Sequence, residues 1–155
     1  LPQEPTLLAG TVRENIRLGF PTATDEALLE AATFGGIRSY FDQHPQGFDF
    51  QIGERGVFLS GGQRQGIALA RAMLNQAELL LLDEPSNAMD QQMEQQLIDR
   101  ITRYAENRTL ILVTHRINLL QLVDRVIVLN DGRVAADGSK SEILNQLSNA
   151  SSATP

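Results

Sequence analysis

Two short runs of residues carry the clearest chemical signal in this chain. Residues 59–63 read LSGGQ and place the small residues Ser60, Gly61 and Gly62 at what reads as the start of a helix. Backbone N–H groups at a helix start carry partial positive charge and bind phosphate without a cationic side chain. Glycine also lets a ligand approach the backbone closely. This run therefore predicts a phosphate-binding helix N-terminus, and the plainer alternative is a serine-capped helix with a flexible entry.

The second run ends in two adjacent carboxylates. Four leucines at positions 79–82 lead into Asp83, Glu84 and Pro85, and such an apolar run indicates a buried strand. Ligands of open α/β sheets bind at the carboxyl ends of their strands. An acidic pair in that place can hold a magnesium ion and supply a general base. Without the preceding leucines and Pro85, two solvated acids at a strand end would be the ordinary interpretation.

The elements that must position these runs divide the chain into two halves. The first half is mostly helical, and the sequence predicts helices over residues 11–18, 24–35, 37–43 and 61–74, with an extended connection over 48–58. The second half alternates, with predicted strands over 79–83, 109–114, 125–129 and 133–137 and helices over 91–104, 117–122 and 139–147. This alternation indicates an α/β fold with a mainly parallel sheet. Asn130-Asp131-Gly132 predicts a tight turn, and residues 148–155 read as a disordered tail.

Composition excludes several classes of protein. The 155 residues suit one domain, and a net charge of −6 argues against a nucleic-acid-binding surface, so no nucleic acid is expected as a partner. The absence of cysteine excludes disulfides and cysteine-bound metals. The longest apolar runs, at 79–82 and 110–113, are far shorter than the ~18 residues of a membrane span.

The order and spacing of the two runs resemble the ATP-binding-cassette (ABC) ATPases, whose signature motif is LSGGQ and whose Walker B motif ends in Asp-Glu. The resemblance covers residues 2–147 and implies ATP and Mg²⁺ as cofactors. It implies a P-loop NTPase-like fold in which residues 1–147 are a partial nucleotide-binding domain. About 11–75 would be the helical signature subdomain, and 76–147 a part of the catalytic core.

The resemblance also implies catalytic roles. Asp83 would hold magnesium through water, and Glu84 would polarise the attacking water. Gln3 stands in a segment, residues 2–16, that resembles the exporter Q-loop, whose glutamine touches the magnesium and the attacking water; taken alone it would be an exposed terminal residue. His115 resembles the switch histidine, which contacts the γ-phosphate and orients Glu84. A lone histidine after a strand is usually structural, but Thr114-His115-Arg116 at this distance from Asp83 favours the catalytic role.

Other residues are implied to act across a head-to-tail dimer. Residues Leu59, Ser60, Gly61, Gly62 and Gln63 would face the nucleotide held by the second domain, and Asp90 in the D-loop, residues 86–90, would reach across the dimer. Asn87 departs from the serine that is commoner in the family. Residues 53–56 (GERG) resemble an exporter loop that contacts the membrane domain, and a solvated turn is the equal alternative.

One family motif is not found in these residues. No G-x-x-x-x-G-K-[ST] phosphate loop occurs, and the chain opens at Leu1-Pro2-Gln3. We therefore expect a portion of a nucleotide-binding domain cut just upstream of Gln3, which lacks the phosphate-loop strand and is inactive on its own.

Within the family the chain looks most like the exporters of type I secretion systems. The stretches 44–49 and 119–134 carry this likeness, although a lipid or peptide exporter would look similar. The likeness implies a transmembrane domain upstream in the same parent chain, a periplasmic adaptor and an outer-membrane channel. It also implies that the parent lies at the cytoplasmic face of the bacterial inner membrane.

Two other classes of protein remain open. Non-transport ABC ATPases of the DNA-repair or chromosome-maintenance kind share LSGGQ, but they insert a long coiled coil between Q-loop and signature. Here Gln3 and Leu59 are joined by a compact segment without sustained heptads. The other class is a non-catalytic interaction module, which is the preferred description of the isolated chain.

Overall fold

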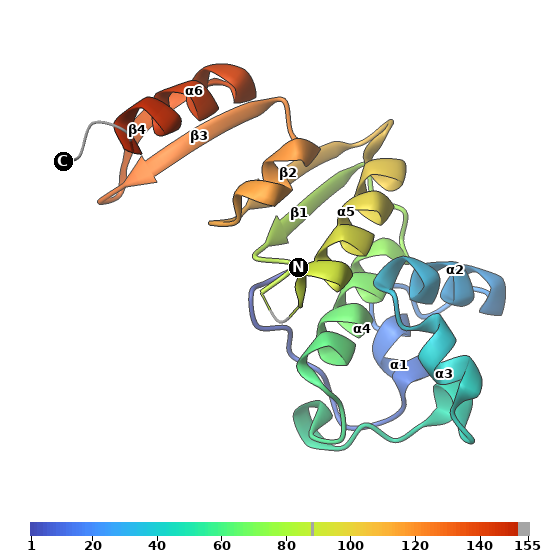
Figure 1. Ribbon diagram of the computed structural model, residues 1–155. Coiled ribbons are helices and arrows are strands. Elements are labelled where there is room, and N and C mark those ends of the chain that lie inside the picture. Colours follow the sequence, from blue (N-terminus) through green and yellow to red (C-terminus); the bar gives the residue numbers. More distant parts are fainter. Residues whose placement is uncertain (88, 152–155) are drawn as a thin grey trace. The chain divides into compact units, whose positions relative to one another are not determined.

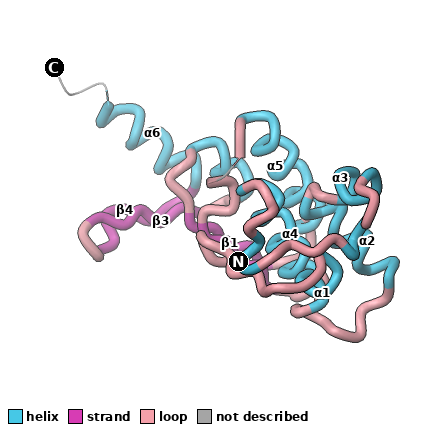
Figure 2. Tube along the Cα trace, turned by 90° about the horizontal axis from the view of Figure 1, so that it is seen from below, coloured by secondary structure: helices cyan, strands magenta, loops and turns pink. Residues whose placement is uncertain are grey.

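The computed structural model describes residues 1–87 and 89–151, and the chain divides into two compact units, 1–114 and 115–155. Helices and loops make up the first 78 residues, and strands begin only with β1 (Figures 1 and 2). None of the described helices has both the length and the apolar character needed to cross a membrane.

Side-chain caps begin three of the four helices in the first half of the first unit. The hydroxyls of Thr11, Thr24 and Ser60 each accept the N–H three residues later, and Thr11 forms a complete capping box with Glu14. Gly36 ends the second helix in a left-handed conformation, φ 73°. The helices are α1 (Val12–Arg17), α2 (Asp25–Gly35), α3 (Arg38–Gln43) and α4 (Gly61–Met73). The caps explain why α1, α2 and α4 begin within a residue of their expected starts.

The connection between α3 and α4 differs from the extended segment expected there. It contains two 3-10 turns, η1 (Gly47–Asp49) and η2 (Glu54–Gly56), and Gln51 forms a single antiparallel bridge with Thr11. Arg55, inside η2, has a left-handed φ of 53°. Left-handed backbone curls the chain locally, and the loose alternation of residues 48–58 does not reveal such curling.

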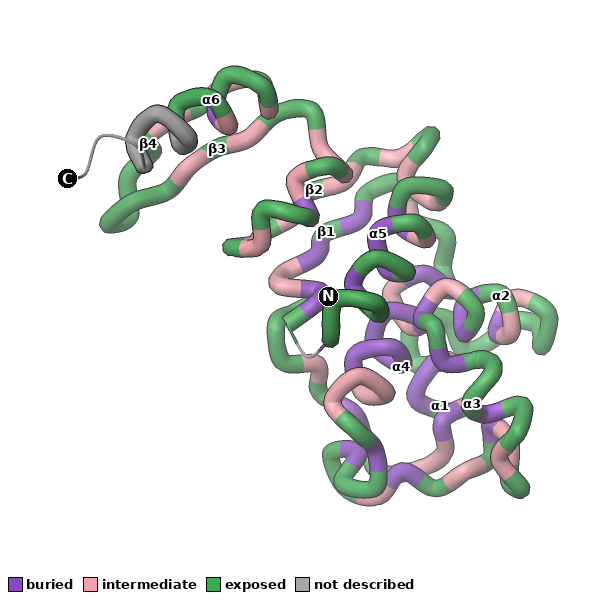
Figure 3. Tube along the Cα trace, in the orientation of Figure 1, coloured by how far each residue is buried: buried purple, intermediate pink, exposed green. Residues whose placement is uncertain are grey.

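A buried apolar cluster joins these helices. Phe41, Ile16 and Ile67 are fully buried members, and the rest are Leu7, Val12, Ala23, Leu28, Ala31, Ala32, Ile37, Phe48, Ile52, Leu59, Ala70 and Leu74. Helix α4 packs against both α1 and α2, and Figure 3 shows buried positions along α4. The LSGGQ helix is therefore held in the centre of the helical core.

Helices α2 and α4 cross at two glycines. A Cβ atom on Gly66 would lie 2.6 Å from the carbonyl oxygen of Gly35 and would also collide with the side chain of Ile37. Backbone therefore packs on backbone at this crossing, and a side chain on either glycine would push the helices apart.

The second part of the first unit is a parallel strand–helix–strand arrangement. Strands β1 (Leu79–Asp83) and β2 (Thr109–Val113) pair in register from Leu79–Thr109 to Asp83–Val113, and α5 (Gln91–Ala105) connects them. A parallel pair joined through a helix confirms the α/β class. Leu80 and Leu82 are buried, whereas Leu79, Leu81, Ile111 and Val113 leave one apolar face about half exposed.

The second unit contains η3 (Ile117–Leu122), strands β3 (Arg125–Asn130) and β4 (Arg133–Ser139), and α6 (Lys140–Ser151). The two strands form an antiparallel hairpin through Asp131 and Gly132, both at positive φ, which confirms the expected tight turn. Two bonds of 2.7 and 2.8 Å join Arg125 to Asp137 across the hairpin, and they hold the pKa of the Asp137 carboxyl below its ordinary value.

The end of α6 differs from the helix end that the sequence predicted. The helix runs to Ser151 instead of ending at Leu147, because no glycine or proline interrupts residues 139–154. The remainder of the expected tail, residues 152–155, lies outside the described residues.

The glycine crossing gives a first testable prediction. Gly66→Ala should lower the free energy of unfolding by about 2 kcal/mol, because overpacking against Gly35 and Ile37 outweighs the helix propensity that alanine gains. Urea denaturation measures the change. Gln92→Ala, on the exposed side of α5, should stay within about 0.5 kcal/mol of the parent chain. A Gly66→Ala chain as stable as the parent would show that the helices have room to separate.

Candidate active site

Strand β1 ends in a turn with an unusual backbone. Glu84 has a left-handed φ of 45°, a conformation that residues other than glycine adopt rarely. Its N–H donates to the carbonyl of Val113 at 2.9 Å, and its carboxylate accepts the Thr114 hydroxyl at 3.3 Å. Backbone strain of this kind clusters at functional sites. The turn places the half-buried Glu84 side chain at the carboxyl edge of the β1–β2 sheet, where β2 holds it.

Two buried hydrogen bonds fix the segment after Glu84. The side-chain amide of Gln65, in α4, donates to the carbonyl of Pro85 at 3.1 Å. The hydroxyl of Ser86 donates to the carboxylate of Glu94, in α5, at 2.9 Å. The LSGGQ helix is thus bonded to the residue that follows Glu84. The sequence patterns did not predict that Gln65 and Glu94 form these bonds, because each looks like an ordinary polar residue on a helix.

Asp83 lies at the last position of β1, with the start of the chain beside it. The amino group of Leu1 donates to the carbonyl of Leu81 at 2.7 Å, and the N–H of Asp83 donates to the carbonyl of Leu1 at 3.0 Å. Figure 1 shows the N-terminus next to the end of β1. The structure therefore places the segment that contains the exposed Gln3 at the same sheet edge as Asp83.

These donors suit a magnesium ion that is shared with a phosphate ligand. Across residues 1–87 and 89–151, no group of three or more His, Cys, Asp or Glu side chains could hold a metal by itself. Mg²⁺ in phosphate-binding sites commonly takes one or two carboxylates and completes its octahedron with waters and phosphate oxygens. The carboxylate of Asp83 and the amide oxygen of Gln3 are oxygen donors of the right kind.

The LSGGQ run forms the N-terminus of α4 as expected. Ser60 and Gln63 form a capping box, in which the Ser60 hydroxyl accepts the Gln63 N–H at 3.2 Å and the Gln63 side-chain oxygen accepts the Ser60 N–H at 2.9 Å. The first backbone bond of the helix runs from Arg64 to the Ser60 carbonyl. The N–H groups of Gly61 and Gly62 precede it and are available to an anion.

The capping geometry gives Ser60 and Leu59 different roles within the LSGGQ run. The Ser60 hydroxyl uses a lone pair for the cap and keeps its hydrogen for another acceptor. Ser60 is exposed, whereas Leu59 is 5% exposed and anchors the run in the helical core. The arrangement fits a phosphate bound by one hydroxyl and two amides.

Asp90 and His115 have roles that the structure describes in part. Asp90 is exposed and caps α5, where its carboxylate accepts the Met93 N–H at 2.8 Å. The neighbouring Ala88 lies outside the described residues. His115 is exposed and opens the second unit, directly after Thr114. The part that each plays at a nucleotide stays a prediction.

A half-buried arginine forms a network that the sequence patterns missed. Arg71, in α4, donates to the Asn15 carbonyl at 2.8 Å, to the Asn15 side-chain oxygen at 3.1 Å and to the Thr6 carbonyl at 2.9 Å. Asn15 is 1% exposed and bonds both backbone groups of Leu8. Burial lowers the pKa of Arg71. The network ties α4 to the segment that follows Gln3.

A capped helix N-terminus with first-turn amides outside the helix bonds, and an Asp-Glu pair at a sheet edge, occur here in one α/β unit and are features of a nucleotide-binding domain. The model of the ABC transporter family matches residues 1–87, which is more than half of the chain. The chain belongs to the ABC transporter family. This finding confirms the resemblance to an ABC transporter ATP-binding domain.

Individual relatives agree with the family. ABC transporter B family member 1 of Arabidopsis thaliana is 40% identical over 144 residues, which are 93% of this chain and 11% of that protein. An ABC transporter ATP-binding protein of Sinorhizobium fredii is 38% identical over 144 residues, 93% of this chain and 25% of that protein. The chain therefore spans a quarter or less of the length of these relatives. They are ABC transporters of various kinds, and they do not single out type I secretion.

A solved structure supports the fold. The structure of a bacterial Atm1-family ABC exporter with ATP bound matches 99% of this chain and 28% of that chain, with a TM-score of 0.88 and 33% identity. The match confirms the fold class as an α/β portion of an ABC ATPase domain.

The arginine network gives a second prediction. Arg71→Leu should lower the free energy of unfolding by about 2 kcal/mol or more, because it leaves the buried oxygens of Asn15 short of a donor. Chemical denaturation provides the measurement. Arg38→Leu removes an exposed ion pair with Asp42 and an exposed 3.5 Å bond to the Thr33 hydroxyl, and it should cost less than about 1 kcal/mol. Equal losses in the two variants would mean that the network contributes no more than a surface pair.

Proposed function

We propose that this chain works within the nucleotide-binding domain of an ABC exporter, which binds and hydrolyses ATP to power transport across a membrane. The observation that supports this most strongly is the strained turn at Glu84. It holds a carboxylate at the sheet edge beside Asp83, and the Gln65–Pro85 bond ties it to the LSGGQ helix.

The residues around the turn divide the hydrolytic work in this proposal. When they are bound, ATP supplies the phosphate bond that is cleaved, and Mg²⁺ neutralises the charge of the phosphates. Asp83 and Gln3 hold the metal ion, and Glu84 takes the proton from the attacking water. The Thr114 hydroxyl keeps the Glu84 carboxylate in place through its 3.3 Å bond. His115 contacts the γ-phosphate and orients Glu84, a role that rests on the family resemblance.

The LSGGQ run acts on a second nucleotide in this proposal. Ser60, Gly61 and Gly62 bind the phosphates held by another nucleotide-binding domain in a head-to-tail homodimer, with Leu59 and Gln63 supporting them and Asp90 reaching across. The exposed serine and the free first-turn amides support this role, because they can reach a ligand outside their own unit.

The partners and location of the parent protein follow the exporter proposal. A transmembrane domain of the same parent chain would lie next to this domain, and residues 53–56 would contact it from the cytoplasmic side. The division into a helical subdomain at about 11–75 and a core part at 76–147 belongs to the same proposal.

Type I protein secretion is the finer proposal for the transported substrate. It would place the parent in a bacterial inner membrane and add a periplasmic adaptor and an outer-membrane channel. Its support comes from residues 44–49 and 119–134. The broader exporter proposal is independent of it and rests on the site.

The role of Glu84 can be tested in the full-length parent protein. Glu84→Gln should slow ATP hydrolysis by about 100-fold or more and leave ATP binding intact, because glutamine keeps the hydrogen-bonding size and loses the base. Turnover assays and nucleotide-binding titrations measure the two effects. Glu106→Gln, at the exposed end of α5, serves as the matched control and should keep normal turnover. Near-normal hydrolysis by Glu84→Gln would remove Glu84 from the role of base.

Mixed dimers test which chain's LSGGQ run serves which nucleotide. In the first dimer, one chain carries both Ser60→Arg and Glu84→Gln and its partner is wild type. In a head-to-tail dimer, Ser60→Arg then damages the site on the partner and Glu84→Gln damages the site on its own chain. With one substitution on each chain, both lesions fall in one site and the other site stays intact. Single-turnover hydrolysis should therefore be higher in the split arrangement. The opposite order would show that the LSGGQ run serves the nucleotide of its own chain.

A further inference from the structure

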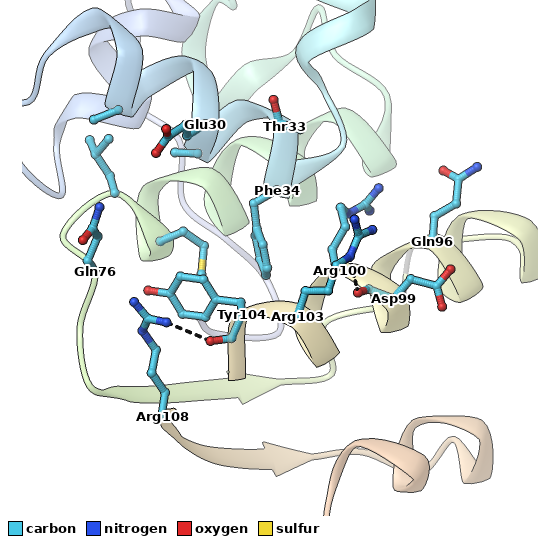
Figure 4. Close-up of a pocket in the computed structure, with 14 residues that line it drawn as sticks. Glu30, Thr33, Phe34, Gln76, Gln96, Asp99, Arg100, Arg103, Tyr104 and Arg108 are labelled. Atoms are coloured by element: carbon cyan, nitrogen blue, oxygen red, sulfur yellow. Dashed lines mark hydrogen bonds between the residues drawn. The ribbon is translucent and has the colours of Figure 1, made fainter. Parts of the chain in front are cut away.

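A second cleft in the first unit shares Gln96 and Arg100 with a smaller cleft that Ser60, Gly62 and Gln63 line. It encloses about 630 Å³ between α2, α5 and the end of α4 (Figure 4). None of the residues assigned to nucleotide or magnesium lines it. Its volume is typical of pockets that bind small organic ligands.

The charged groups of the cleft favour an anion. Three arginines, Arg100, Arg103 and Arg108, line it together with two carboxylates, Glu30 and Asp99. Arg103 and Arg108 donate to the backbone carbonyls of Asp99 and Tyr104, at 3.1 and 2.9 Å, and each keeps further N–H groups for a ligand. The side chain of Asp99 already accepts a bond from Gln95 at 3.1 Å. The balance of charge in the cleft is positive.

Arg100 is the least satisfied of the three arginines. Its Nε atom is buried and has no hydrogen-bond partner in the part of the chain that the structure describes. Burial lowers the pKa of Arg100, and the neighbouring Arg103 lowers it further, while Asp99 raises it. The terminal nitrogens of this half-buried guanidinium are suited to a carboxylate or phosphate, which a guanidinium binds through two parallel bonds.

A structural role for Arg100 accounts for only part of this arrangement. The terminal nitrogens lie against Gly36, since a Cβ atom built there would be 2.9 Å from both of them. Gly36 follows α2, whose last turn holds no basic residue, so the charge of Arg100 complements the helix dipole. That role explains the place of the charge and leaves the buried Nε donor without an acceptor.

Aromatic rings line the cleft beside Arg100. The rings of Phe34 and Tyr104 lie 5.3 Å apart at 57°, and the Arg108 guanidinium covers one face of Tyr104 at 3.9 Å. Figure 4 shows the Phe34 side chain between Tyr104 and Arg100, pointing into the cleft. Met73 and Leu74 add further apolar surface. A flat ring could pack against these side chains while its charged group reaches Arg100.

We propose that the cleft between α2 and α5 is a binding site for a small aromatic carboxylate, whose ring packs against Phe34 and Tyr104 and whose carboxylate binds Arg100. Arg100 also lines a smaller cleft together with Ser60, Gly62 and Gln63, so the proposed site adjoins the LSGGQ run at this residue. Its occupation does not depend on ATP hydrolysis.

Two matched probes test the charge requirement. Isothermal titration of the purified chain with 2-naphthoate and with its neutral analogue 2-naphthamide compares an anion and a non-ion of the same shape. The naphthoate should bind at least about tenfold more tightly, because a bond to a charged partner is stronger than a neutral one. Equal affinity for the two probes, or no binding of either, would overturn the proposal.

Variants then test the residues. Arg100→Gln should remove the preference for naphthoate, and Phe34→Leu should weaken both probes. Arg133→Gln, an exposed position in β4 that does not line the cleft, should change neither. Circular dichroism shows whether each variant is folded. A folded Arg100→Gln chain that keeps the full preference would overturn the assignment. Should Arg100→Gln fail to fold, Arg100→Lys replaces it, because lysine keeps the charge and cannot form two parallel bonds. This variant must weaken naphthoate binding, and an unchanged affinity counts against the proposal.

Discussion

The turn after β1 is the constraint on which the candidate active site depends, because three elements meet there. Glu84 adopts a left-handed backbone that costs roughly 1–2 kcal/mol for a residue with a side chain. Bonds from Glu84 to Val113, from Thr114 to Glu84 and from Gln65 to Pro85 offset that cost, since each contributes about 1 kcal/mol. The strand pair and the LSGGQ helix therefore determine together where the Glu84 carboxylate lies.

Helix α4 links this turn to the segment that contains Gln3. Gln65 donates a hydrogen bond to Pro85, the residue after Glu84. About two turns later in the same helix, Arg71 donates hydrogen bonds to Asn15 and Thr6. The close packing of Gly66 on Gly35 leaves the helix little room to shift against α2. A displacement of α4 would therefore be transmitted to both segments. In the proposed function this coupling relates the LSGGQ run, which serves one nucleotide, to Glu84, which serves another.

Local patterns predicted the elements well and the contacts between them poorly. Thr24 and Ser60 marked helix starts, Gly36 marked an end, and the leucine run marked β1, because caps and apolar runs act within a few residues. The 3-10 turns near Arg55 and the extension of α6 were missed, since weak alternation and small polar residues are compatible with several conformations. The Arg71 network and the Gln65–Pro85 bond join residues 20 to 65 positions apart. Such partners are determined by packing, which no local pattern records.

The central claim is that two chains complete each ATP site. An experimental structure of the full-length parent with ATP bound tests it most directly. The account predicts that the Ser60 hydroxyl and the Gly62 N–H of one chain lie within hydrogen-bond distance of a nucleotide whose other side faces Asp83 and Glu84 of the second chain. A structure in which Ser60 and Glu84 of the same chain enclose one nucleotide would contradict it.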